Sequence, residues 1–134
     1  MMYFIDTNTC IYFLNGKFPS VREKFLSLSP KNIKIASVVK AELLLGGYKS
    51  NSREQTLQKV EKFLKPFEIV PFSDEMTAEY AHIRSELERA GKTIGGNDYF
   101  IAAIVRNKNG ILVTHNVDEF SRINNLKIED WVVE

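Results

Sequence analysis

The sequence predicts an α/β fold: a three-layer α/β/α sandwich around a central, mostly parallel sheet of about four to five strands. Two observations lead to this prediction. Short apolar segments alternate along the chain with longer segments of helical periodicity, which is the pattern of β-α-β units. The short segments are apolar at consecutive positions, as in strands that are buried on both faces. The 134 residues, 44% of them hydrophobic, suffice for one core, and we expect a single domain over residues 1–134.

The first strand is predicted at Tyr3–Ile5, the apolar segment nearest the N-terminus. The polar residues after it open a helix, and Gly16 ends that helix because glycine adopts the left-handed conformation of a helix C-cap. Pro19 opens a second helix, since proline is favoured in the first helical turn. The periodicity of this helix places Phe25 and Leu26 on its apolar face.

The second strand is predicted at residues 33–36, another short apolar segment. Ser37 has a side chain that can accept a hydrogen bond from a helical N–H, so we expect it to cap a helix over residues 38–45. The pair Gly46-Gly47 is expected to end this helix.

The third strand is predicted at residues 67–70, between two helices. The helix before it covers residues 52–65, carries one apolar stripe and is closed by Pro66. The helix after it is long, covers residues 73–90 and ends at Gly91.

The last helix of the pattern is predicted at residues 98–107, with Asn97 as its cap. Its centre is apolar nearly all round, so we expect it to be buried. A fourth strand follows at residues 111–113, and a fifth, at an edge of the sheet, is expected at residues 128–133.

Five polar residues lie either just after a predicted strand or near the start of a predicted helix. Asp6 comes directly after the first strand, Glu42 lies early in the helix after the second, and Asp98 opens the helix before the fourth. Asn116 and Glu119 come just after the fourth strand. In a parallel sheet, the carboxyl ends of strands and the amino ends of the helices share one edge, where ligands bind. Any one of these acids could simply cap a helix, but several carboxylates at one edge repel each other unless a cation binds.

The residues at this edge offer oxygen ligands. Cys10 is the only cysteine and lies in an apolar stretch, where we expect packing rather than chemistry. His115 directly precedes Asn116 in the sequence, but we expect no catalytic role for it. An all-oxygen ligand set favours Mg²⁺, with Mn²⁺ as its substitute, over zinc. Such an ion suits phosphodiester hydrolysis, because it activates water and neutralises charge on the phosphoryl group.

The composition excludes several classes of protein. The formal net charge is +1, from 18 Lys and Arg against 17 Asp and Glu, so the chain does not coat nucleic acid by charge alone. No apolar run reaches the roughly 20 residues of a membrane-spanning helix. The N-terminus lacks the basic and apolar regions of a signal peptide, and we expect a cytoplasmic protein.

Taken in order, the motifs of the chain resemble the PIN domain, and more narrowly the VapC-type toxins of bacterial toxin–antitoxin modules. The resemblance covers essentially the whole chain. It rests on Asp6-Thr7-Asn8, Ala41-Glu42-Leu43 with Gly46, Asn97-Asp98 with Ile101-Ala102-Ala103, Val113-Thr114-His115-Asn116 ending in Phe120, and the closing Leu126–Trp131.

The resemblance implies a PIN-like sandwich and an Mg²⁺-dependent endoribonuclease. It also implies a cognate antitoxin protein, a homodimer, a hetero-oligomer with the antitoxin, and an RNA substrate, with tRNA among the candidates. By position, Asp6, Glu42 and Asp98 match the three principal acids of the family, which hold the metal. Many members have Asp where Asn116 stands. If residues 116–119 form a helical turn, Glu119 faces the same way as Asn116 and supplies the missing carboxylate.

Two other functions stay open at this point. A phosphotransfer domain of the receiver or haloacid-dehalogenase type also has an acidic Mg²⁺ pocket, but the dehalogenase pattern needs an Asp where this chain has Asn8. A non-catalytic PIN-like binding module is the second alternative, and the neutral Asn116 is the residue that favours it.

Overall fold

A five-stranded parallel sheet in the order β3-β2-β1-β4-β5 forms the centre of the molecule, as a computed structural model that describes residues 1–134 shows. Every neighbouring pair of strands is parallel. The α/β prediction is therefore confirmed, and the sheet has no antiparallel strand. The strands are β1 (Tyr3–Ile5), β2 (Ile33–Ala36), β3 (Glu68–Val70), β4 (Ile111–Val113) and β5 (Lys127–Glu129).

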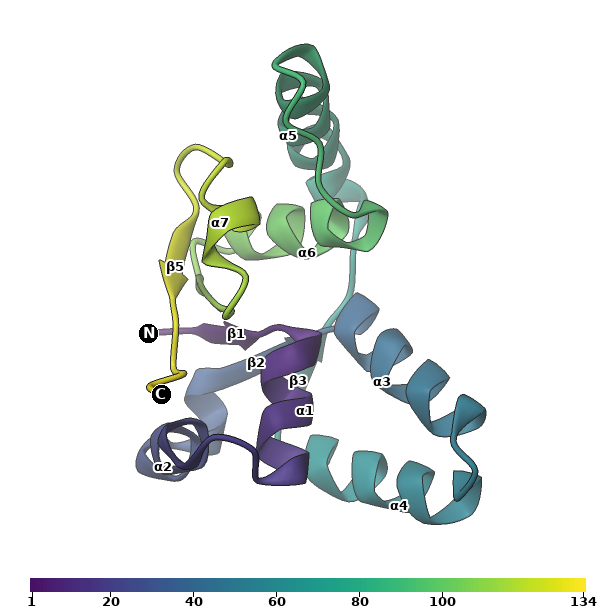
Figure 1. Ribbon diagram of the computed structural model, residues 1–134. Coiled ribbons are helices and arrows are strands. Elements are labelled where there is room, and N and C mark those ends of the chain that lie inside the picture. The colour runs from purple at the N-terminus through teal and green to yellow at the C-terminus, as the bar shows by residue number, and fades with distance from the viewer.

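Helices cover the sheet on both sides and make three layers (Figure 1). One group consists of α1 (Thr7–Asn15), α2 (Pro19–Ser27), α3 (Ser37–Lys49) and α4 (Arg53–Leu64). The other consists of α5 (Thr77–Arg89), α6 (Gly96–Asn107) and α7 (Val117–Phe120). Two short 3₁₀ turns complete the chain: η1 (Pro30–Asn32) lies between α2 and β2, and η2 (Asp74–Met76) lies between β3 and α5. None of the helices combines the length and the apolar composition that crossing a bilayer requires.

The order of the strands creates a switch point between β1 and β4. From β1 the chain moves outward to β2 and β3, and then returns to place β4 on the other side of β1. The connections on the two sides of this point therefore lead away from each other and leave a crevice outside the carboxyl ends of the strands. Asp6, the next residue after β1, faces this crevice.

The core supports the switch point from both sides. Consecutive residues of β1 and β4 are buried, among them Phe4, Ile5, Leu112 and Val113. Residues 101–105 of α6 are also almost fully buried, as its apolar composition predicted. Because these elements are tightly packed, the loops that leave them start from fixed positions.

Helix α3 corrects the prediction that Gly46 and Gly47 end it, because the helix continues to Lys49. Neither glycine has a positive φ. A Cβ atom on Gly47 would lie 2.5 Å from Cδ2 of Leu57 in α4. Gly47 therefore allows α3 and α4 to pack closely. Ser37 does not cap this helix either: it is the first helical residue, and Ala36 occupies the cap position without a side-chain hydrogen bond.

Three smaller predictions about side chains and ends are also wrong. Leu26 is 66% exposed, and only Phe25 of that pair is buried. Gly95, and not Asn97, is the N-cap of α6. Strand β5 ends at Glu129 because the following segment leaves the sheet for α2. There Ser20 Oγ donates to the Trp131 carbonyl at 2.8 Å and accepts from the Val133 N–H at 2.9 Å.

Candidate active site

A cavity of about 320 Å³ lies at the carboxyl edge of the sheet, where β1 and β4 end. All five of the residues that the sequence singled out line it. The full lining is Asp6, Thr7, Asn8, Glu42, Asp98, Ile101, Asn116, Glu119 and Phe120. The topology thus brings together acids that are far apart in sequence.

Asp6 is held where β1 passes into α1. Its backbone N–H donates to the Val113 carbonyl of β4 at 3.0 Å, and its carboxylate accepts the Thr9 N–H at 2.9 Å as the N-cap of α1. The residue is only 7% exposed. Burial raises the pKa of the Asp6 carboxyl, while hydrogen bonds from Thr114 and Thr9 oppose the rise. Asp6 therefore caps a helix and also faces the cavity.

Glu42 is held by residues from two other helices. Its Oε1 accepts a short hydrogen bond from the Thr7 hydroxyl in α1, and its Oε2 accepts from Asn97 Nδ2 in α6 at 3.2 Å. Sequence reasoning assigned Asn97 to a helix cap and missed this contact. The position of Asn97 directly before Asp98, in a helical turn at the same edge, was the available signal.

Asp98 lies half-buried in the first turn of α6. Burial raises the pKa of its carboxyl to about 6, with smaller contributions from the negative charges of Glu42, Glu119 and Asp6. A Cβ atom on Gly95 would lie 3.2 Å from Asp98 Oδ2, so glycine leaves room for this carboxylate. Asp98 is therefore a partly desolvated carboxylate that also feels the charges of the three other acids.

Asn116 and Glu119 enter the cavity from α7. Asn116 is the N-cap of this short helix, and its backbone N–H donates to Thr114 Oγ1 at 2.9 Å. Its side-chain amide donates a short hydrogen bond to the Glu119 carboxylate. The side chain of Asp118, in contrast, is 95% exposed and lies 3.7 Å from Arg122. Glu119 is thus the acid of this helix that reaches the cavity.

The donors of the cavity suit a hard divalent cation. They are carboxylate, amide and hydroxyl oxygens, with neither sulfur nor imidazole among them. No three acidic, cysteine or histidine side chains are close enough to hold one ion directly. Mg²⁺ is usually held by one or two direct carboxylates and keeps several of its waters. The residues therefore fit an ion that some of the carboxylates contact through water.

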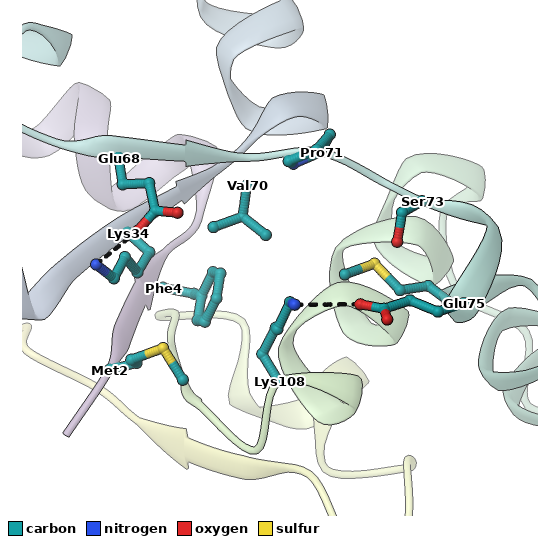
Figure 2. Close-up of a pocket in the computed structure, with 10 residues that line it drawn as sticks. Met2, Phe4, Lys34, Glu68, Val70, Pro71, Ser73, Glu75 and Lys108 are labelled. Carbon is teal, nitrogen blue, oxygen red and sulfur yellow. Dashed lines mark hydrogen bonds and ion pairs between the residues drawn. The ribbon is translucent and has the colours of Figure 1, made fainter.

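A second cavity, of about 490 Å³, lies on the sheet away from these acids (Figure 2). Its charged groups already have partners: Lys34 pairs with Glu68 at 2.8 Å, and Lys108 pairs with Glu75 at 3.1 Å. The buried Ser73 hydroxyl has no hydrogen-bond partner. Because its charges neutralise each other, this cavity lacks the unpaired acids that metal-dependent chemistry needs.

The two histidines lie outside the acidic cavity. His115 Nδ1 lies 2.9 Å from Asp130 Oδ2, and this contact holds its ring against the C-terminal segment. His82 lies on the surface of α5, 3.3 Å from Glu86 and 3.1 Å from Arg106. Neither histidine lines the cavity.

An apolar cleft of about 430 Å³ lies on a different part of the surface, between α1, α2 and α4. Both aromatic and basic side chains line it. The lining consists of Phe13, Leu14, Arg22, Lys59, Lys62, Phe63, Pro66 and Phe67. We call this surface the apolar cleft.

Comparison with known proteins gives a consistent result. The model of the PIN domain family matches residues 3–126. The chain is 44% identical to Ribonuclease VapC2 of Rickettsia felis over 133 residues, which cover 98% of both chains. It is 35% identical to the tRNA(fMet)-specific endonuclease VapC of Shigella flexneri, again over 98% of both. Its fold matches the crystal structure of VapBC2 from Rickettsia felis bound to a promoter DNA fragment, with a TM-score of 0.92 and 42% identity over 98% and 99% of the two chains.

Proposed function

This chain belongs to the PIN domain family, and from that premise we propose that it is a metal-dependent endoribonuclease, the toxin of a toxin–antitoxin module. The observation that carries the proposal is the convergence of four carboxylates in one cavity at the switch point of the sheet. Two of its relatives, a ribonuclease and a tRNA endonuclease, support the same chemistry.

We propose that Asp6, Glu42 and Asp98 hold Mg²⁺, for which Mn²⁺ substitutes. The raised pKa of Asp98 is consistent with this assignment: burial is its main cause, and a bound cation would stabilise the buried charge and relieve the smaller repulsion from the other carboxylates. When bound, the ion would activate water and neutralise charge on the scissile phosphate. The chain itself orients the ligands: Thr9 and Thr114 hold Asp6, while Thr7 and Asn97 hold Glu42.

Glu119 is the proposed fourth acid. The hydrogen bond from the Asn116 amide fixes the Glu119 carboxylate at the cavity, so Asn116 acts by positioning an acid from the next turn. This arrangement favours a nuclease over a non-catalytic relative, because the negative charge that Asn116 lacks is provided three residues later. It leaves the site with four carboxylates.

The proposed protein partner is an antitoxin that covers the apolar cleft. The cleft exposes aromatic and aliphatic groups, and Arg22, Lys59 and Lys62 give it a basic character. An amphipathic segment with acidic residues would complement it. The VapBC2 complex that the fold matches supports a hetero-oligomer of this kind, and we also propose a homodimer and a cytoplasmic location.

We propose tRNA as the first substrate to test, since one relative is named for cleavage of tRNA(fMet). The purified protein is incubated with total tRNA and Mg²⁺, and the RNA ends are sequenced. Wild-type protein is expected to cut at few positions, and Asp98→Asn to lose at least about two orders of magnitude in rate.

Asp118→Asn is the matched control, because it removes an acid from the same segment as Glu119 but from a side chain that is 95% exposed. It is expected to cleave like the wild type. If wild-type protein and Asp98→Asn are equally inert with every RNA class, the chain is a binding module and the proposal is wrong. Labelling of Asp6 by acetyl phosphate would instead indicate phosphotransfer.

A further inference from the structure

An aromatic cluster, formed by Tyr12, Lys17, Phe18 and His115, lies about one helical turn along α1 from the residues that line the acidic cavity; we call it the Tyr12 cluster. The Tyr12 and Phe18 ring centroids are 4.9 Å apart, and the His115 ring lies 6.4 and 6.3 Å from them. Lys17 Nζ lies 5.4 Å from the Tyr12 centroid and 5.3 Å from that of Phe18. The cluster thus combines three rings with a cation.

Two elements connect the Tyr12 cluster to the cavity. Asn8 lines the cavity, and Tyr12 follows it by four residues in α1, which places both on one helix face about 6 Å apart along the axis. His115 directly precedes Asn116, which also lines the cavity. A chain-like ligand that places one of its groups at the acids could therefore place the neighbouring group against the rings.

The rings are accessible and fixed in place. Tyr12 and Phe18 are half-buried, and the side chain of His115 is 40% exposed. Asp130 holds the His115 ring through Oδ2, while its Oδ1 accepts the Val132 N–H at 3.0 Å. Glu134 lies 3.9 Å from His115 Nε2. Asp130 and Glu134 offset any positive charge on His115. Lys17 is therefore the group of the cluster that can attract an anion.

We infer that the Tyr12 cluster stacks a nucleobase of single-stranded RNA, next to the nucleotide whose phosphate lies at the acids. This inference rests on the proposed function. Aromatic side chains stack on the faces of unpaired bases, both purines and pyrimidines, and a nearby cation attracts the backbone phosphate. The apolar cleft also combines rings with basic side chains, but none of its lining residues lines the acidic cavity, so it is assigned to a protein partner and not to the nucleotide beside the acids.

The test uses short RNA oligonucleotides that carry 2-aminopurine at successive positions, bound in EDTA so that cleavage does not occur. Stacking quenches the fluorescence of this base. At one position, wild-type protein is expected to quench strongly. Tyr12→Leu and His115→Ala are expected to lose the quenching and to weaken binding by about fivefold to a hundredfold. Lys17→Ala, an exposed position with little effect on folding, is expected to weaken binding at low salt.

The control is Tyr48→Leu. Tyr48 is exposed, at 57%, and also lies under a cation, with Arg53 5.7 Å from its ring centroid, but it stands near the C-terminal end of α3, six residues beyond Glu42. It is expected to leave binding and quenching unchanged. Circular dichroism melts show which variants remain folded at the temperature of the assay.

An abasic site at the quenched position completes a thermodynamic cycle. It should weaken binding to wild-type protein and have no further effect on Tyr12→Leu, because both changes remove the same contact. Additive losses would overturn the inference, as would unchanged RNA binding by Tyr12→Leu together with weaker antitoxin binding. Quenching by a wild-type protein that cleaves no RNA would contradict the proposed function and leave the stacking site standing.

Discussion

At Asp98, burial and the charges of three other carboxylates act in the same direction. Its carboxyl has a pKa of about 6, against an ordinary value of 3.8, because its charged form is poorly solvated and repelled. Linkage then fixes the sign of the effect on stability. A carboxyl whose pKa is raised on folding favours the folded state when it is protonated, and this contribution is lost as the pH rises from below 3.8 through 6.

Asp98→Asn is therefore expected to stabilise the metal-free protein at pH 7.5 and to change its stability much less at pH 4. Thermal melts in EDTA across this range measure the difference. Added Mg²⁺ should reverse the order at pH 7.5, since it binds the folded wild type and not the variant. A stabilisation by Asp98→Asn that is the same at both pH values would contradict the account.

Asn97 has a different role in the structure from the one that the sequence predicts: it contacts Glu42 and does not cap a helix. Its amide donates to Glu42 across the cavity, so Asn97→Ala is expected to lower metal affinity by about tenfold to a hundredfold without unfolding the protein. Titration with Mn²⁺ measures the affinity. Asn125→Ala, in an exposed loop, is the control, although its positive φ of 63° adds a small strain. Equal affinities for wild type and Asn97→Ala would exclude the positioning role.

At this scale, the sequence could predict which acids share an edge, and the structure brings Asp6, Glu42 and Asp98 into one cavity. It could also relate Glu119 to Asn116 through the spacing of a helical turn. It could not predict the Asn97 contact, because that depends on the distance between α3 and α6. Chain order does not determine such distances between side chains.

Among the secondary-structure elements, α3 shows that a pair of glycines, Gly46 and Gly47, need not end a helix. Both lie inside α3, and only Gly47 faces another helix. Gly47→Ala places a methyl group against Leu57 and is expected to destabilise the protein by about 1–3 kcal/mol, the usual effect of overpacking. Gly46→Ala has open space and is expected to stabilise it by about 0.5–1 kcal/mol. Denaturant unfolding measures both, and equal effects would contradict the packing role of Gly47.

The ends of the strands, like the roles of these glycines, depend on contacts with other segments of the chain. The sequence predicted β1, β2 and β4 correctly, because short apolar segments bounded by polar residues leave little choice. It extended β5 as far as residue 133, although the strand ends at Glu129. The contacts of Ser20 with Trp131 and Val133 draw that segment toward α2, and these contacts join residues more than a hundred positions apart. Local pattern carries no information about them.

At the scale of the whole molecule, the order of the strands explains the site. Placing β4 beside β1 brings Asp6 next to the residues that follow Val113, and α3 and α6 add Glu42 and Asp98 from the two helical layers. Asp6, Asp98 and Glu119 stand at or near the start of a helix, where a carboxylate is favourable, so the cost of gathering four negative charges is partly offset. The rest of that cost is what a bound cation would remove.

Binding of Mn²⁺ to the purified protein, measured by calorimetry at pH 7.5, tests this central claim most directly. Wild-type protein and Asp118→Asn are expected to bind at least one ion with equal affinity, while Asp98→Asn and Asp6→Asn lose binding. If the wild type binds no ion, or if all four proteins bind it equally well, the acids of this cavity do not form a metal site.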